Sequence, residues 1–150
     1  MTTAGEPAER TLRATLAVAE VPFGPEDADS IHAVGRALFE RGDHTDAVHV
    51  FRLLALVAPT SPRSWTALAS YHDVLGDVER ARALYGLALG VPDHDEFRPF
   101  AAANKARLDL DAGDAEAAEC ALESVDNDCV ESAELERLLV SVRSRLGRAS

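Results

Sequence analysis

The sequence predicts an all-α fold in which three helix hairpins stack into a superhelix, with one flanking helix at each end. The chain of 150 residues is 47% hydrophobic but only 5% aromatic. This composition favours helices packed through small side chains, because strand-rich folds need more aromatic and β-branched residues. A Gly-Asp dipeptide also recurs along the chain at a nearly regular spacing. At this length we expect a single domain, 1–150.

The recurring dipeptide predicts three helix-turn-helix corners. It occurs at Gly42-Asp43, Gly76-Asp77 and Gly113-Asp114, and an alanine follows five residues after each glycine. The interval from the first copy to the second is slightly shorter than the interval from the second to the third. Glycine ends a helix in the left-handed conformation without a Cβ penalty, and the aspartate that follows can cap the next helix by accepting its free N–H groups.

The residues around these corners match the pattern of the tetratricopeptide repeat (TPR), and the interval from Gly42 to Gly76 equals the period of that repeat. The small residues would let the two helices of a hairpin approach closely, while Trp65, Phe51 and Tyr85 would fill the space between hairpins, with Trp65 in the core. The matching positions of the first two repeats are Gly35, Gly42, Ala47, Phe51, Pro59, Trp65, Leu68, Gly76, Ala81, Tyr85 and Ala88, and the third repeat keeps Ala106, Gly113, Ala118 and Leu122.

The repeats are expected at about 28–61, 62–95 and 99–132. Between the first two, the run Pro59-Thr60-Ser61-Pro62 stops one helix and starts another, with Ser61 as the N-cap and Pro62 at the first helical position.

Flanking helices are expected at about 7–20 and 132–146. In the second, apolar residues recur at helical spacing, so this helix is predicted to cap the stack, and Gly147 is predicted to end it.

The charge of the chain disfavours two classes of partner. Fifteen basic and 26 acidic residues give a net charge of -11, which repels nucleic-acid phosphates and anionic lipid head groups. The N-terminal residues lack the pattern of a signal peptide, and no apolar run is long enough to span a bilayer. Cys120 and Cys129 show no paired spacing, which fits a reducing cytoplasm.

The sequence predicts neither a catalytic site nor a cofactor or metal site. It has no glycine-rich phosphate loop, no H-E-x-x-H and no G-x-S-x-G motif, and its only lysine is Lys105. The five histidines are scattered. Between Arg107 and Arg137 the chain has eleven acidic residues and no basic one. This acidic segment, within 109–136, is either a solvated convex face or a surface for a basic partner.

Three strings follow one another from Ile31 to Leu122: IHAVGRALFERGDHTDAVHVFRLLALVAP, SWTALASYHDVLGDVERARALYGLAL and EFRPFAAANKARLDLDAGDAEAAECAL. Together they resemble the class II type III secretion chaperones, bacterial TPR proteins that escort the hydrophobic translocator subunits of the injection apparatus. The resemblance includes the run Phe97-Arg98-Pro99-Phe100, near the place where the family opens its third repeat with a proline-phenylalanine element.

The resemblance implies that the concave face, lined by the first helix of each hairpin, binds an extended segment of a translocator and catalyses nothing. A general TPR interaction adaptor or a needle-subunit chaperone is the alternative function. By register, the peptide-binding positions would be His32, Arg36, Phe39, Thr66, Ser70, Asp73, Phe100, Ala103 and Arg107.

Two further expectations follow from the resemblance. Family members often have tyrosine or phenylalanine where this chain has His32, Arg36 and His44, so a groove richer in cations is expected to prefer a more polar or acidic client. Family members also commonly dimerise through the N-terminal helix. Here the apolar residues of that helix either form a homodimer interface or dock on the first hairpin; they are Leu12, Leu16 and Val18.

Overall fold

The computed structural model describes residues 25–125, 130 and 132–149. The expected N-terminal helix at 7–20 and Cys129 lie outside these residues. The described residues form only helices and connections, so the all-α prediction is confirmed. The helices are α2 (Pro25–Glu40), α3 (His44–Val57), α4 (Pro62–Val74), α5 (Val78–Gly90), α6 (Phe97–Asp111), α7 (Ala115–Glu123) and α8 (Ala133–Ala149).

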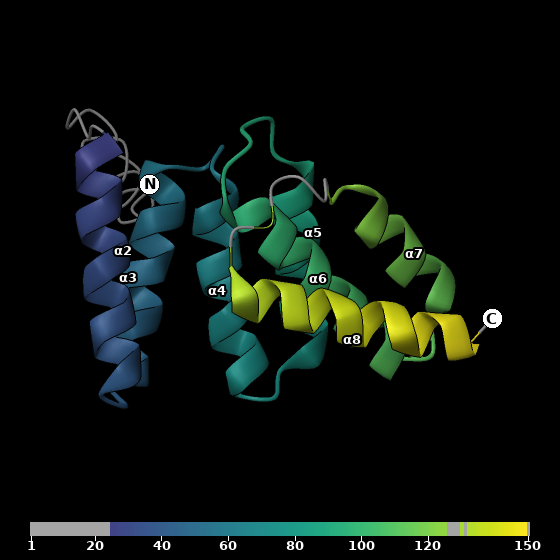
Figure 1. Ribbon diagram of the computed structural model, residues 1–150. Helices are drawn as coiled ribbons and strands as arrows, with labels where there is room; N and C mark the ends of the chain where they lie inside the picture. The colour runs from purple at the N-terminus through teal and green to yellow at the C-terminus, as the bar shows by residue number, and fades with distance from the viewer. Residues whose placement is uncertain (1–24, 126–129, 131, 150) are drawn as a thin grey trace, which may run out of the picture.

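The helices pair into the three predicted hairpins, α2 with α3, α4 with α5, and α6 with α7, and the hairpins lie side by side (Figure 1). The last helix, α8, packs along α6 and α7. No helix in the described part of the chain combines the length and the apolar character that a membrane span requires.

The three corners have the predicted left-handed glycines. Gly42, Gly76 and Gly113 have φ of 87°, 80° and 79°, a conformation that costs glycine little because it has no Cβ. In each corner the N–H of the following aspartate donates to a helix carbonyl five residues back, as from Asp43 to Leu38 at 2.9 Å. This bond satisfies a carbonyl that the helix end would otherwise leave unpaired.

The capping prediction is right at two corners and wrong at the first. The Asp77 side chain accepts from the N–H of Arg80 at 3.4 Å, and the Asp114 side chain accepts from the N–H of Ala117 at 3.0 Å. Asp43 makes no such bond. Its carboxylate instead accepts from the guanidinium of Arg41 at 2.8 Å, which competes with the capping geometry.

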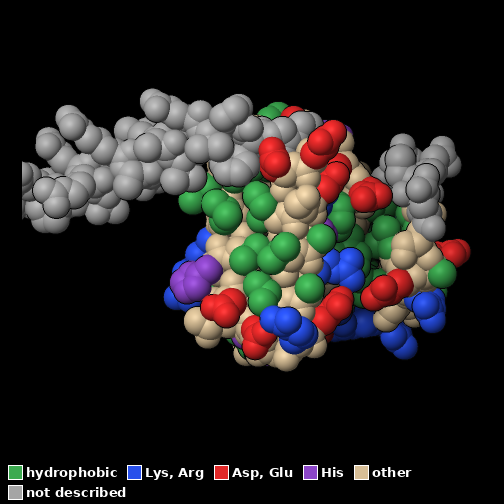
Figure 2. All heavy atoms as spheres, turned by 90° about the vertical axis from the view of Figure 1, so that its left-hand side faces the viewer, with side chains coloured by type: hydrophobic (Ala, Val, Ile, Leu, Met, Phe, Trp, Pro, Cys, Tyr) green, Lys and Arg blue, Asp and Glu red, His purple; other side chains and the backbone are tan. Residues whose placement is uncertain are grey.

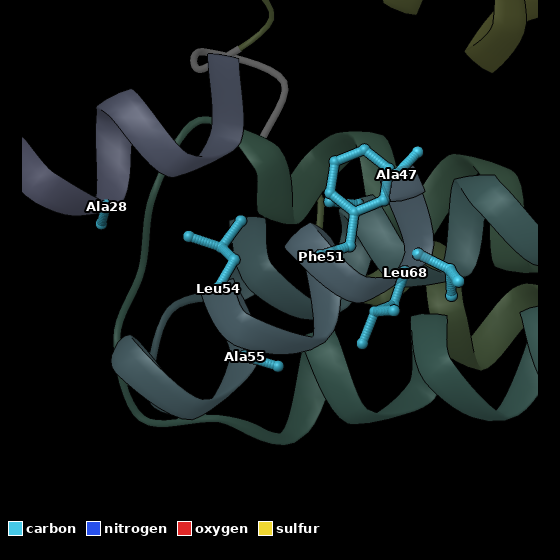
Figure 3. Close-up of a cluster of buried hydrophobic side chains, with 8 residues drawn as sticks. Ala28, Ala47, Phe51, Leu54, Ala55 and Leu68 are labelled. Atoms are coloured by element: carbon cyan, nitrogen blue, oxygen red, sulfur yellow. The ribbon is translucent and has the colours of Figure 1, made fainter. Parts of the chain in front are cut away.

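The core between the first two hairpins is built from α2, α3 and α4. Phe51 is 4% exposed and packs with Leu54, Leu68 and Ala47 (Figure 3). A Cβ added to Gly35 would lie 2.5 Å from Cε1 of Phe51. The two helices therefore reach their close packing only because residue 35 has no side chain.

The large aromatic residues of the repeats take different positions. Phe51 and Tyr85 are buried, as predicted. The prediction of a core Trp65 is only partly right, because this side chain is half-buried, between the core around Phe51 and the core around Tyr85. Its indole N–H donates to the carbonyl of Pro59 at 2.8 Å, so one edge of the ring stays near the surface, where its polar group has a partner.

The connection between α3 and α4 is held by Asp95, which lies in the connection between α5 and α6. Pro62 stands in the first turn of α4, as predicted, but the Ser61 side chain does not cap that helix. Its hydroxyl donates to Asp95 at 2.9 Å, and the same carboxylate accepts from the N–H of Arg63 at 3.2 Å and of Phe97 at 2.9 Å. Asp95 thus joins the start of α4 to the start of α6.

The second and third hairpins are joined by an ion-pair cluster around Asp109, which is fully buried. Its carboxylate accepts from Nε of Arg82 at 2.8 Å and from Nζ of Lys105 at 2.7 Å. Because an unpaired buried carboxylate would be costly, these two cations are what allow Asp109 to sit between α5 and α6. This contact gives the only lysine of the chain a structural role.

The C-terminal helix covers the third hairpin, as predicted. Leu135, Leu139 and Val142 are 4%, 2% and 1% exposed, and they pack against α6 and α7. The helix continues to Ala149, so the prediction that Gly147 ends it is wrong.

Candidate binding groove

The concave face holds an open groove of about 950 Å³. Its walls come from α2, α4, the connection before α6, and the first turns of α6 and α8. Figure 2 looks onto α2 and shows the hollow beside it, with hydrophobic side chains inside and both acidic and basic side chains around it. The groove thus spans the first two hairpins and ends where α8 begins.

The structure brings six of the nine predicted positions to this groove and places the other three outside it. The six are His32, Arg36, Phe39, Thr66, Ser70 and Phe100. Thr66 contributes little polar surface, because it is 3% exposed and its hydroxyl donates to the carbonyl of Pro62 at 2.7 Å.

Ala103 does not face the groove, contrary to the register-based prediction. It is 0% exposed and packs in a core cluster with Leu135 and Leu139 of α8. The alignment of the three repeats correctly places residue 103 on the inner side of α6. That side is covered by α8, so a foreign chain cannot reach it in this structure.

Asp73 and Arg107 form an ion pair with each other, between α4 and α6. Asp73 also accepts from the Tyr85 hydroxyl at 3.4 Å, and that hydroxyl lies 3.3 Å from Oγ of Ser70. Burial raises the pKa of Tyr85 well above its usual range, so this phenol stays protonated and keeps its role as a donor. Ser70 lines the groove, whereas Asp73, Tyr85 and Arg107 do not.

Aromatic rings supply most of the apolar wall. Phe39 contacts His44 and Tyr71 edge to face, with ring centroids 4.8 and 6.0 Å apart, and His32 contacts Phe97 in the same way at 5.4 Å. Such edge-to-face contacts hold the rings in defined positions. Tyr71 and Phe97 line the groove but were not among the predicted positions. Phe97 belongs to the Phe-Arg-Pro-Phe run, which was the available signal for it.

The groove is acidic, so the expectation of a cation-rich groove is wrong. Burial lowers the pKa of His32 to about 4, with Arg63 and Arg36 acting in the same direction, which leaves this ring neutral at pH 7. Among the described residues that line the groove, Arg36 is the only lysine or arginine, and it pairs with Glu40 at 3.2 Å. The remaining carboxylates come from Asp95, Glu96 and Glu134.

Over the part of the chain that the structure describes, no three histidine, cysteine or acidic side chains gather in a way that would hold a metal ion. The groove lining consists of aromatic, small and charged side chains.

Neither a family model nor a curated protein matches the sequence. Solved structures do match the fold. SycD of Yersinia enterocolitica, in complex with a peptide of the translocator YopD, has a TM-score of 0.66 at 18% identity, over 84% of this chain and 94% of that one. PcrH of Pseudomonas aeruginosa, in complex with the chaperone binding region of PopD, has a TM-score of 0.65 at 20% identity, over 85% and 93%.

A fungal protein has a similar likeness. The TPR domain of Sgt2 from Aspergillus fumigatus matches with a TM-score of 0.62 at 22% identity, over 84% of this chain and 82% of that one. These three comparisons confirm the TPR fold, and they confirm that the predicted resemblance to translocator chaperones holds for the fold.

Proposed function

We propose that this protein is a bacterial chaperone that binds an extended segment of a hydrophobic, secreted translocator in its concave groove. The observation that carries the proposal is an open groove with aromatic walls. The fold of the chain is like that of SycD, solved with a peptide of the translocator YopD, and like that of PcrH, solved with the chaperone binding region of PopD. The protein would act in the cytoplasm by binding alone and would catalyse no reaction.

The groove gives a physical reason for such an activity. Apolar side chains of the client would leave water for the surface around Phe39, Tyr71 and Phe97, and each Å² of apolar area buried is worth roughly 25 cal/mol. Because the rings already hold one another in place, little ordering is needed on binding. A translocator held in this way would neither aggregate nor insert into a membrane before export.

Co-expression tests this proposal directly. The protein is produced together with each translocator of the same secretion system, and the soluble complexes are isolated. Phe39→Ala should reduce the yield of complex at least several-fold, because Phe39 forms the α2 wall of the groove. Leu56→Ala is the matched control, since Leu56 is 66% exposed and does not line the groove.

Two results would contradict the proposal. One is that every translocator remains insoluble with the wild-type protein. The other is that Phe39→Ala, shown to be folded by circular dichroism, retains full binding.

A general TPR adaptor or a needle-subunit chaperone remains the second candidate function. The observation that favours it is the fold likeness to the Sgt2 TPR domain, which is close to the likeness to SycD and PcrH. A pull-down from the native host, with Phe39→Ala as the comparison, identifies the ligand of the groove and separates the candidates.

The homodimer through the N-terminal helix at 7–20 stays a prediction. One of the similar structures is SycD in an alternative dimer. The mass of the full chain in solution, compared with that of a Leu12→Asp/Leu16→Asp variant, tests it: a dimer that becomes a monomer supports the interface, and an unchanged mass contradicts it.

A further inference from the structure

The charged side chains that line the groove are not balanced. On α2, Arg36 and Glu40 neutralise each other at 3.2 Å. The groove is also lined by Glu96, the last residue before α6, and by Glu134, in the first turn of α8. Both are exposed, and neither has a hydrogen bond or an ion pair with any described residue.

The position of these two carboxylates is not explained by helix stability alone. An acidic side chain at the N-terminus of a helix interacts favourably with the helix dipole, which accounts for Glu96 at the N-cap of α6 and for Glu134 in the first turn of α8, each taken by itself. Glu96 and Glu134 belong to segments far apart in the sequence, yet both border the same groove together with Phe97 and Phe100. The helix dipole does not account for this shared position. Asp95 adds a third negative charge to the groove lining, although its oxygens accept hydrogen bonds from Ser61, Arg63 and Phe97.

From this arrangement we infer that the groove selects client segments in which lysine or arginine adjoins the apolar residues. The inference rests on the proposed function and specifies its client. The apolar residues of the segment occupy the aromatic part of the groove, and the basic residue meets Glu96 and Glu134. An acidic segment is disfavoured, because it would bring like charge to unbalanced carboxylates on a chain of net charge -11.

The expected selectivity is modest, because exposed ion pairs are weakened by water and salt. We expect a change in affinity of about three- to tenfold for the two carboxylates together. The same charges should raise the association rate at low ionic strength, because the field of these carboxylates attracts a basic segment before contact.

Display of a random dodecapeptide library against the full-length protein tests the inference without knowledge of the natural client. Enriched peptides should combine apolar residues with neighbouring lysine or arginine. The variant Glu96→Gln/Glu134→Gln should keep the apolar enrichment and lose the basic one. Glu119→Gln/Glu123→Gln is the matched control, because it removes the same charge from exposed positions of α7 outside the groove, and it should behave as the wild type does.

One enriched peptide then completes the test by fluorescence anisotropy. Changing its lysine to glutamine should weaken binding about three- to tenfold in the wild type and leave it unchanged in Glu96→Gln/Glu134→Gln, as a coupled pair requires. Apolar enrichment without basic enrichment, or equal effects in the two proteins, overturns the inference but leaves the chaperone proposal standing. Failure to enrich apolar peptides, or enrichment that Phe39→Ala does not reduce, counts against the proposed function itself.

Discussion

The inner face of the stack differs between its two halves. Over the first two hairpins, α2 and α4 leave their inner sides open, and Phe39 and Ser70 line the groove. Over the third hairpin, α8 covers the inner side of α6, and Ala103 becomes part of the core. Equivalent positions of the repeat therefore line an open groove in one half and belong to a packed core in the other, because α8 covers the third hairpin.

The first prediction concerns the third hairpin, where α8 covers the inner side of α6, and it has the largest change in stability. Leu139 of α8 is 2% exposed and packs with Ala102 and Ala103. Leu139→Ala should lower the free energy of unfolding by about 2–5 kcal/mol, because it leaves a cavity in a packed core. Val140→Ala is the control on the same helix, since Val140 is 62% exposed, and its effect should stay within about 0.5 kcal/mol. Equal urea midpoints for the two variants would show that α8 does not cover α6.

The second prediction concerns the packing of α2 against α3, beside the open groove, and has a smaller change in stability. Gly35→Ala should destabilise the protein by about 1–3 kcal/mol, because its Cβ would lie 2.5 Å from Cε1 of Phe51 in a filled core. Gly147→Ala has nothing within 4 Å and lies within α8, so it should be neutral or stabilise by up to about 1 kcal/mol. Urea unfolding of both variants is the measurement. A Gly35→Ala protein as stable as the wild type would mean that α2 and α3 do not pack this closely.

The third prediction concerns His32 in the open groove and how the stability of the protein depends on pH, and it has the smallest effect. His32 takes up a proton near pH 6.5 when unfolded, but burial lowers its pKa in the folded protein to about 4. The unfolded chain therefore binds more protons between these values, and stability should fall as pH drops from about 6.5 toward 4. His32→Gln should reduce the loss of stability between pH 7.5 and pH 5.

The control for this prediction is His49→Gln, which changes an exposed histidine outside the groove and should follow the wild type. Urea midpoints at the two pH values give the comparison. If His32→Gln and the wild type lose stability equally, the burial of His32 does not contribute to the pH dependence.

Local features of the fold could be predicted from the sequence, because they depend on residues that are close along the chain. The left-handed glycines at the corners and the caps at Asp77 and Asp114 belong to this class. The capping prediction was wrong at Asp43, because the guanidinium of Arg41, two residues earlier, donates to the Asp43 carboxylate. Competition between two such partners is decided by side-chain geometry that a motif does not contain.

The parts of the groove that could not be predicted depend on contacts between distant segments. The alignment of the repeats identified the inner side of the first helix in each hairpin. It could not predict that α8 would cover Ala103. It also could not assign Asp95, which holds the start of α4 from a connection more than thirty residues later. The acidic character of the groove arises from the same source, because its unbalanced carboxylates lie outside the repeat positions.

We propose that a client segment occupies the open half of the inner face while α8 stays on the third hairpin. NMR spectra of the full chain, recorded with and without a bound client segment, test this directly. We expect the largest chemical-shift changes at Phe39, Ser70 and Phe97, with Ala103 and Leu139 almost unchanged. Largest changes at Ala103 and Leu139 would instead show that α8 leaves the third hairpin and that the client binds in its place.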